Sequence, residues 1–106
     1  MTAYRSAALL ALGDPTRLAI LERLAERPLA VVDLTRKLPV SRPAVSQHLR
    51  VLKDAGLVVD QAVGNRRIYR ADPDALAALR DQLDWFWGKA MAAYKATVEQ
   101  PNEEEA

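Results

Sequence analysis

Apolar side chains recur at the spacing of an amphipathic helix between residues 42 and 55. At 100° per residue, Val45, Leu49 and Leu52 fall on one narrow stripe, and such a stripe predicts a side that faces a core. The opposite side of the segment is polar and basic. The pattern therefore predicts a short helix that exposes a hydrophilic face.

Residues at both ends of this segment predict where the helix begins and ends. Ser41 is a favoured N-cap, and Pro43 lies in the first turn, where its missing N–H costs nothing. Gly56 suits the left-handed position just after a helix. We therefore expect the helix to run from about residue 42 to residue 55.

Two short strands are predicted directly after that helix. Residues 58–63 and 67–71 are rich in strand-forming side chains, and the Gly64-Asn65 pair between them suits a tight hairpin turn. Arg66 and Arg67 stand at the tip of this predicted hairpin. A helix with a basic outer face followed by a basic hairpin is the arrangement of a winged helix-turn-helix.

Local start and stop signals predict the other elements. We expect helices over residues 3–12, 15–27, 31–38 and 73–98, with Asp14 and Asp72 as the caps of the second and the last, and a very short strand at residues 29–30 that adds to the hairpin. The second helix should bury Leu18, Ile20, Leu21 and Leu24. The expected fold class is mainly α with a small β-hairpin, a winged helix-turn-helix that dimerises through its terminal helices.

The predicted last helix is long for a chain of this size. About 25 residues at 1.5 Å each give about 38 Å, whereas a compact domain of this size has a radius of gyration of about 13 Å. Its apolar side chains form a band wider than one neighbouring helix would cover, so we expect a dimer interface there. The predicted members are Leu76, Leu79, Leu83, Phe86, Trp87, Ala90, Met91 and Tyr94.

Composition narrows the class of protein. The chain has 106 residues, no cysteine and no run of about 18 apolar residues, which predicts one soluble domain over residues 1–99 without a membrane span. We expect residues 100–106 to form a disordered acidic tail and the protein to be cytoplasmic. No Ser-His-Asp set, catalytic carboxylate pair or Gly-rich phosphate loop is recognisable, so we expect no enzyme and no cofactor.

Basic residues are concentrated on the predicted helix and hairpin, although the net charge is only +1. Residues 41–70 carry six basic side chains against two acidic ones, and a local basic surface is typical of nucleic-acid binding. Gln47 suits adenine and Arg50 suits guanine in the major groove. The predicted DNA contacts are Ser41, Arg42, Pro43, Ser46, Gln47, Arg50, Lys53, Arg66 and Arg67. An ordinary solvated face, with Ser41 acting only as a helix cap, is the alternative.

Four segments carry a shared pattern: D-P-T-R-L-A-I-L at 14–21, V-V-D-L at 31–34, S-R-P-A-V-S-Q-H-L-R-V-L-K-D-A-G-L-V at 41–58 and G-N-R-R-I-Y-R at 64–70. Together they resemble the ArsR family of bacterial winged helix-turn-helix repressors, and the resemblance spans about residues 5–98. It implies a homodimer that presents two recognition helices to a pseudo-palindromic operator in double-stranded DNA. It also implies repression that an inducer relieves.

The chain departs from the metal-sensing members of that family. Those members place cysteines just before an Asp-Leu pair in the third helix, where this chain has aliphatic residues 30–32 before Asp33. Sites on the terminal helix need histidines, and the one histidine is His48. Asp81 and Asp84 alone are a poor zinc site. We therefore expect no metal site, and the sequence leaves open an inducer of other chemistry.

Some alternatives stay open at the level of the sequence. His48 lies at the edge of the buried stripe, which favours packing over a role as a ligand or proton switch. Trp85 lies about opposite the apolar band, where it packs on the first helix or a partner subunit, or lines a ligand pocket. The rival functions are a winged-helix protein-interaction module without DNA, and a small-molecule-responsive sensor of the same fold. The basic outer face favours DNA over the first rival.

Overall fold

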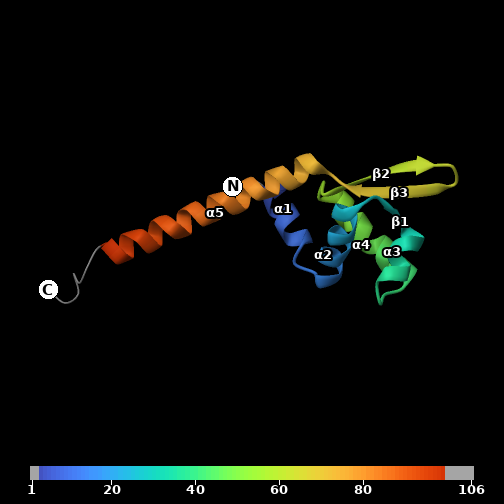
Figure 1. The fold of residues 1–106 in the computed structure, drawn as a ribbon, viewed down its shortest axis with the longest axis horizontal. Helices are drawn as coiled ribbons and strands as arrows, with labels where there is room; N and C mark the ends of the chain where they lie inside the picture. The colour runs from blue at the N-terminus through green and yellow to red at the C-terminus, as the bar shows by residue number, and fades with distance from the viewer. Residues whose placement is uncertain (1–2, 100–106) are drawn as a thin grey trace.

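The computed structural model describes residues 3–99, with side chains from residue 7 onward. Its elements are α1 (Ala3–Ala11), α2 (Pro15–Glu26), β1 (Leu29–Ala30), α3 (Val31–Lys37), α4 (Arg42–Asp54), β2 (Val58–Val63), β3 (Arg66–Ala71) and α5 (Pro73–Glu99) (Figure 1). This is the predicted order, so the mainly α fold with a small β-hairpin is confirmed. The predicted tail, residues 100–106, lies outside the described residues.

The three strands form one antiparallel sheet in the order β1-β3-β2. The short strand pairs with β3 through Leu29 and Tyr69, which confirms that it adds to the hairpin. The hairpin closes with Val63 opposite Arg66, so β3 begins one residue earlier than predicted. Gly64 takes a φ of 64° in the turn, a backbone conformation that glycine adopts at little cost.

Apolar residues from α1 to α5 pack into a single core. Its most deeply buried side chains are Ile20, Leu34, Val45, Leu49, Leu52, Leu57 and Val58. The prediction for α2 was wrong at Leu18, whose side chain is 42% exposed. The three buried positions of α2 span about 100° of the helix circumference, and Leu18 lies about 100° away from the middle of that arc.

Local signals fix the start of α2 and the end of α4, the helix that precedes the β2–β3 hairpin, which we call the wing. The Asp14 carboxylate accepts hydrogen bonds from the backbone N–H groups of Thr16 (2.8 Å) and Arg17 (3.1 Å) at the start of α2. At the end of α4, Gly56 has a φ of 81° and its N–H donates to the Lys53 carbonyl at 2.9 Å. The Leu57 N–H donates to the Leu52 carbonyl at 3.0 Å, which completes a Schellman motif. Helix α4 therefore leads into β2 through a defined turn.

Helix α5 leaves the domain soon after it begins. Its 27 residues include only two buried side chains, Leu79 and Gln82, and every residue from Leu83 to Glu99 is exposed. The molecule measures 71 × 26 × 23 Å, with a radius of gyration of 18.9 Å. Figure 1 shows α5 extending on one side while the β2–β3 hairpin projects on the other. None of the described helices is both long and apolar enough to span a membrane.

The structure divides the predicted dimer band into two parts. Leu79 is only 8% exposed and Leu76 is partly buried, because both pack against the core of their own chain. Little of the Leu79 side chain is therefore left for a second subunit, which corrects its assignment to an interface. The remaining members, Leu83, Phe86, Trp87, Ala90, Met91 and Tyr94, are all exposed.

Candidate nucleic-acid interface

Helix α4 turns its polar side chains outward and anchors itself with its apolar ones. Val45, Leu49 and Leu52 are almost completely buried, as the spacing predicts. The predicted contacts on the opposite face, Arg42, Pro43, Ser46, Gln47, Arg50 and Lys53, are all exposed. Because the buried stripe fixes the rotation of the helix, these six side chains are held toward the surroundings.

The first turn of α4 combines a helix cap with an exposed cation. The Ser41 hydroxyl oxygen accepts a hydrogen bond from the Ala44 N–H at 3.3 Å, so Ser41 serves as the N-cap. Pro43 occupies the first turn, where no N–H is needed. Arg42 is exposed beside the positive end of the helix dipole, and this end of a helix attracts phosphate.

A concave surface of about 360 Å³ lies along the middle of α4, and we call it the α4 hollow. Its lining residues are Ser46, Gln47, Arg50, Lys53, Asp54 and Tyr69. Tyr69 comes from β3 and is half-buried, with one side against the core. Tyr69 therefore packs as a strand residue and also forms part of the wall of the hollow. The side chains best suited to base edges, Gln47 and Arg50, therefore share one concave surface.

Asp60 on β2 joins the recognition helix to the wing. Its carboxylate lies 2.9 Å from the Lys53 ammonium and 2.8 Å from the Arg67 guanidinium. The Asp60 side chain is only 7% exposed. The hydrogen bond from Lys53, with that from Arg67, holds the pKa of Asp60 below its usual value despite the opposing effect of burial. Lys53 and Arg67, both predicted as DNA contacts, are thus already paired within the protein.

The other wing arginine is also paired. The Arg66 guanidinium lies 3.0 Å from the Asp33 carboxylate on α3, and the Arg66 side chain remains 52% exposed. Asp33 also accepts a hydrogen bond from the Ala30 N–H at 3.4 Å. The wing is therefore tied both to α4, through Asp60, and to α3, through Asp33.

Sequence reasoning missed both of these carboxylates. Asp60 shares its strand face with the buried Val58, and an acidic residue on such a face requires partners. The alternation of the two faces along residues 58–60 therefore could have indicated that Asp60 is paired with basic side chains. No comparable signal existed for Asp33, because its partner Arg66 lies 33 positions away along the chain.

The geometry of the helix and wing agrees with comparisons to known proteins. A family model described as "Bacterial regulatory protein, arsR family" matches residues 14–59, from the cap of α2 into β2. The chain is also 57% identical over 101 residues to the HTH-type transcriptional regulator Rv2034 of Mycobacterium tuberculosis, covering 93% of this chain and 94% of that protein. This chain belongs to the ArsR family.

Other ArsR-family relatives support the assignment in sequence and in structure. The arsenical resistance operon repressor of Escherichia coli is 38% identical over 77 residues, 72% of this chain and 66% of that protein. The structure of an ArsR-like transcriptional regulator from Rhodococcus sp. RHA1 superposes with a TM-score of 0.75 at 34% identity, covering 90% of this chain and 92% of that one. The chain is therefore a helix-turn-helix transcriptional regulator, and a protein-interaction module without DNA function is not favoured.

This ArsR-family protein has aliphatic side chains at the positions in α3 where metal sensors of the family carry cysteines. Ala30 is buried and Val31 and Val32 are half-buried at the start of α3. Within the described part of the chain, no three His, Cys, Asp or Glu residues come together to hold a metal ion.

Proposed function

We propose that the chain is a homodimeric repressor that reads a pseudo-palindromic operator in double-stranded DNA. The observation that carries the proposal is the outward face of α4, where Ser46, Gln47 and Arg50 line one hollow above a fully buried apolar stripe. A helix held in this way presents its polar side chains to a major groove with little freedom to rotate. The protein acts through binding alone, with residues 1–99 as one DNA-binding and dimerisation domain.

The proposal gives different tasks to the individual contacts. Gln47 and Arg50 read base edges, Gln47 suiting adenine and Arg50 suiting guanine. Arg42 and the first turn of α4 meet a backbone phosphate, while Ser41 remains the cap. Lys53 and Arg67 stay on Asp60 and position the wing. Arg66, which is half-exposed, moves from Asp33 to a phosphate in the complex.

The second part of the proposal is the dimer. Helix α5 exposes Leu83, Phe86, Trp87, Met91, Tyr94 and Val98, each at least 40%. A contiguous apolar surface of this kind is typical of an interface rather than of a solvated helix. Two copies that pair along this part of α5 present two α4 helices, and half-sites about 34 Å apart on one side of the duplex would suit them.

Fluorescence anisotropy with promoter DNA from the chain's own gene tests the proposal. We expect affinity to fall steeply as salt rises, because phosphate neutralisation releases counterions. Arg50→Ala should weaken binding about 5- to 150-fold and relax the preference for one base pair, corresponding to about 1–3 kcal/mol for a bidentate contact. Lys95→Gln removes a positive charge from the far part of α5 and should change little. An affinity that responds neither to salt nor to Arg50→Ala would contradict the proposal.

A further inference from the structure

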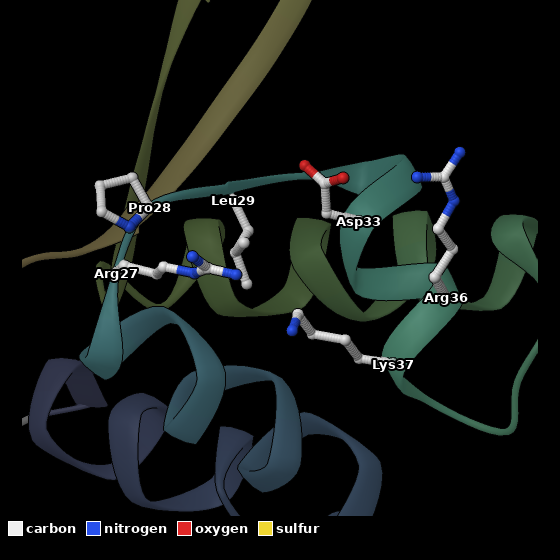
Figure 2. Close-up of a pocket in the computed structure, with 6 residues that line it drawn as sticks. All are labelled: Arg27, Pro28, Leu29, Asp33, Arg36 and Lys37. Atoms are coloured by element: carbon white, nitrogen blue, oxygen red, sulfur yellow. The ribbon is translucent and has the colours of Figure 1, made fainter.

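A second concave surface lies on the other side of the helix-turn-helix. This α3 hollow has a volume of about 450 Å³ and lies between the end of α2 and one face of α3. Its lining residues are Arg27, Pro28, Leu29, Asp33, Arg36 and Lys37 (Figure 2). It shares no residue with the α4 hollow, so the recognition of bases leaves it unused.

The charges in the α3 hollow are not balanced by its own carboxylate. Asp33, Arg36 and Lys37 follow the i, i+3, i+4 spacing of neighbours on a helix surface, so Asp33 would ordinarily pair with one of the two cations. Its carboxylate instead pairs with Arg66 of the wing at 3.0 Å. Among the described residues, no carboxylate lies within 4.0 Å of the cationic groups of Arg27, Arg36 or Lys37.

Two of these cations converge across the hollow. Figure 2 shows the Arg27 guanidinium and the Lys37 ammonium extending toward one another, whereas the Arg36 guanidinium extends away from both. The C-terminal dipoles of α2 and α3 favour nearby cations, and they account for part of this arrangement. Each dipole supplies only about half a negative charge, so Arg27 and Lys37 still leave a net charge of about +1 between them. Two like charges that face one another across an open hollow favour an anion between them.

We propose that Arg27 and Lys37 form a binding site for a phosphate group. The planar fork of Arg27 suits two phosphate oxygens, and Lys37 supplies a point charge from the opposite side. The hollow is open and large enough for a phosphorylated small molecule. The same chemistry would also suit a backbone phosphate of bound DNA.

The pairing of Asp33 and Arg66 favours the small molecule over DNA. An anion in the hollow lies beside Asp33 and is tolerated best when Arg66 neutralises that carboxylate. This step rests on the function proposed above, in which Arg66 leaves Asp33 for a DNA phosphate when the operator binds. The unpaired Asp33 carboxylate then repels an anion in the α3 hollow. Occupancy of the α3 hollow and binding of the operator therefore oppose one another, and by linkage the effect is reciprocal.

Titration of the full chain with pyrophosphate, without DNA and at fixed ionic strength, tests the site directly. We expect pyrophosphate to bind more tightly than chloride, and Arg27→Gln or Lys37→Gln to weaken it about tenfold through the loss of a charge-assisted hydrogen bond. The control Lys95→Gln should leave binding unchanged. Both substituted side chains are exposed, so melting temperatures near that of the parent should show that the fold is retained.

Promoter DNA in a second arm distinguishes the two sources of phosphate. If the site takes a small molecule, pyrophosphate weakens DNA binding, and Arg66→Gln removes this effect. If it takes a DNA phosphate instead, pyrophosphate competes with DNA whether or not Arg66 is present, and Arg27→Gln and Lys37→Gln each lower the salt slope of DNA binding by about one. The phosphate site is overturned if pyrophosphate does not bind and neither Arg27→Gln nor Lys37→Gln changes the salt slope, while Arg50→Ala still weakens DNA binding. Loss of the Arg50 effect alone would count against the proposed operator function and not against the site.

Discussion

At the scale of single residues, the interface is organised by acidic side chains rather than by the basic ones that mark it. Asp60 and Asp33 hold three of the basic side chains predicted to contact DNA, namely Lys53, Arg66 and Arg67. A paired cation holds a position, whereas a free cation supplies affinity for phosphate. The basic surface is therefore partly a scaffold.

Removing the Asp60 carboxylate should destabilise the fold in a pH-dependent way. We expect Asp60→Asn to lower the free energy of unfolding by about 1–3 kcal/mol at pH 7, because two charge-assisted hydrogen bonds are lost. Since its pKa in the folded state lies below the usual 3.8, its contribution is present above that value and is lost as the pH falls through the folded pKa. Urea unfolding at pH 7 and pH 3 measures the difference.

Asp54→Asn is the matched control, because Asp54 is exposed and makes no ion pair within the described residues. It should change stability by less than about 0.5 kcal/mol at either pH. An Asp60 variant as stable as the parent at pH 7 would show that Asp60 does not hold the wing.

Base-reading residues were easier to predict than pairing residues. Gln47 and Arg50 lie on a helix whose exposed face follows from the spacing of Val45 and Leu49. The exposed positions of these two side chains were therefore predictable, whereas their contacts with DNA remain predictions. The partners of Arg66 and Arg67 depend on how distant segments fold together, and local sequence does not carry that information.

At the scale of elements, the sequence predicted most boundaries because most ends carry a local signal. Asp14 caps α2 with its own side chain, and Gly56 ends α4 through its left-handed backbone. The first residue of β3 has no such marker, because the pairing of Val63 with Arg66 extends the strand by one residue. Leu18 was misplaced since burial depends on which neighbours cover a helix, not only on its apolar content.

Two glycines outside the core should respond to alanine with opposite signs. Gly64 has a φ of 64°, so Gly64→Ala should destabilise the fold by about 1–2 kcal/mol through backbone strain alone. Gly88 lies in the middle of α5 with no atom within 4 Å of an added Cβ, so Gly88→Ala should stabilise that helix by about 1 kcal/mol.

Urea unfolding of both glycine variants at equal protein concentration measures these effects. Gly88 lies outside the proposed dimer band, so its substitution should also leave the oligomeric state unchanged. A destabilised Gly88→Ala variant would indicate that another helix approaches α5 closely on that side.

At the scale of the whole molecule, α5 contributes to two different structures. Its first part belongs to the core through Leu79, and its last part, from Leu83 to Glu99, is exposed and carries the apolar band. The sequence predicted the overhang from length alone. It did not predict where the core ends, because the three-four spacing of apolar residues continues without a break from one part to the other.

Substitutions in the two parts of α5 should separate stability from association. We expect Trp87→Glu to give a monomer by analytical ultracentrifugation at micromolar concentration, because Trp87 is 67% exposed in the single chain and would be covered in the dimer. Leu79→Ala should instead lower stability by about 2–5 kcal/mol through a cavity in the core, with association retained at permissive temperature. A dimeric Trp87→Glu variant would exclude this band as the interface.

The junction between β3 and α5 has a mechanical consequence. Asp72 is the one residue between them, and its N–H donates to the Leu57 carbonyl at 3.0 Å, so strand and helix meet with almost no slack. The six-residue strands of the hairpin form an arm about 20 Å long. A tilt of α5 by about 10° that this junction passes on to the hairpin would move the hairpin tip by about 3.5 Å, close to the rise of one base pair. In the proposed dimer, a small change in how the two α5 helices cross would therefore shift the wings by one step along the DNA.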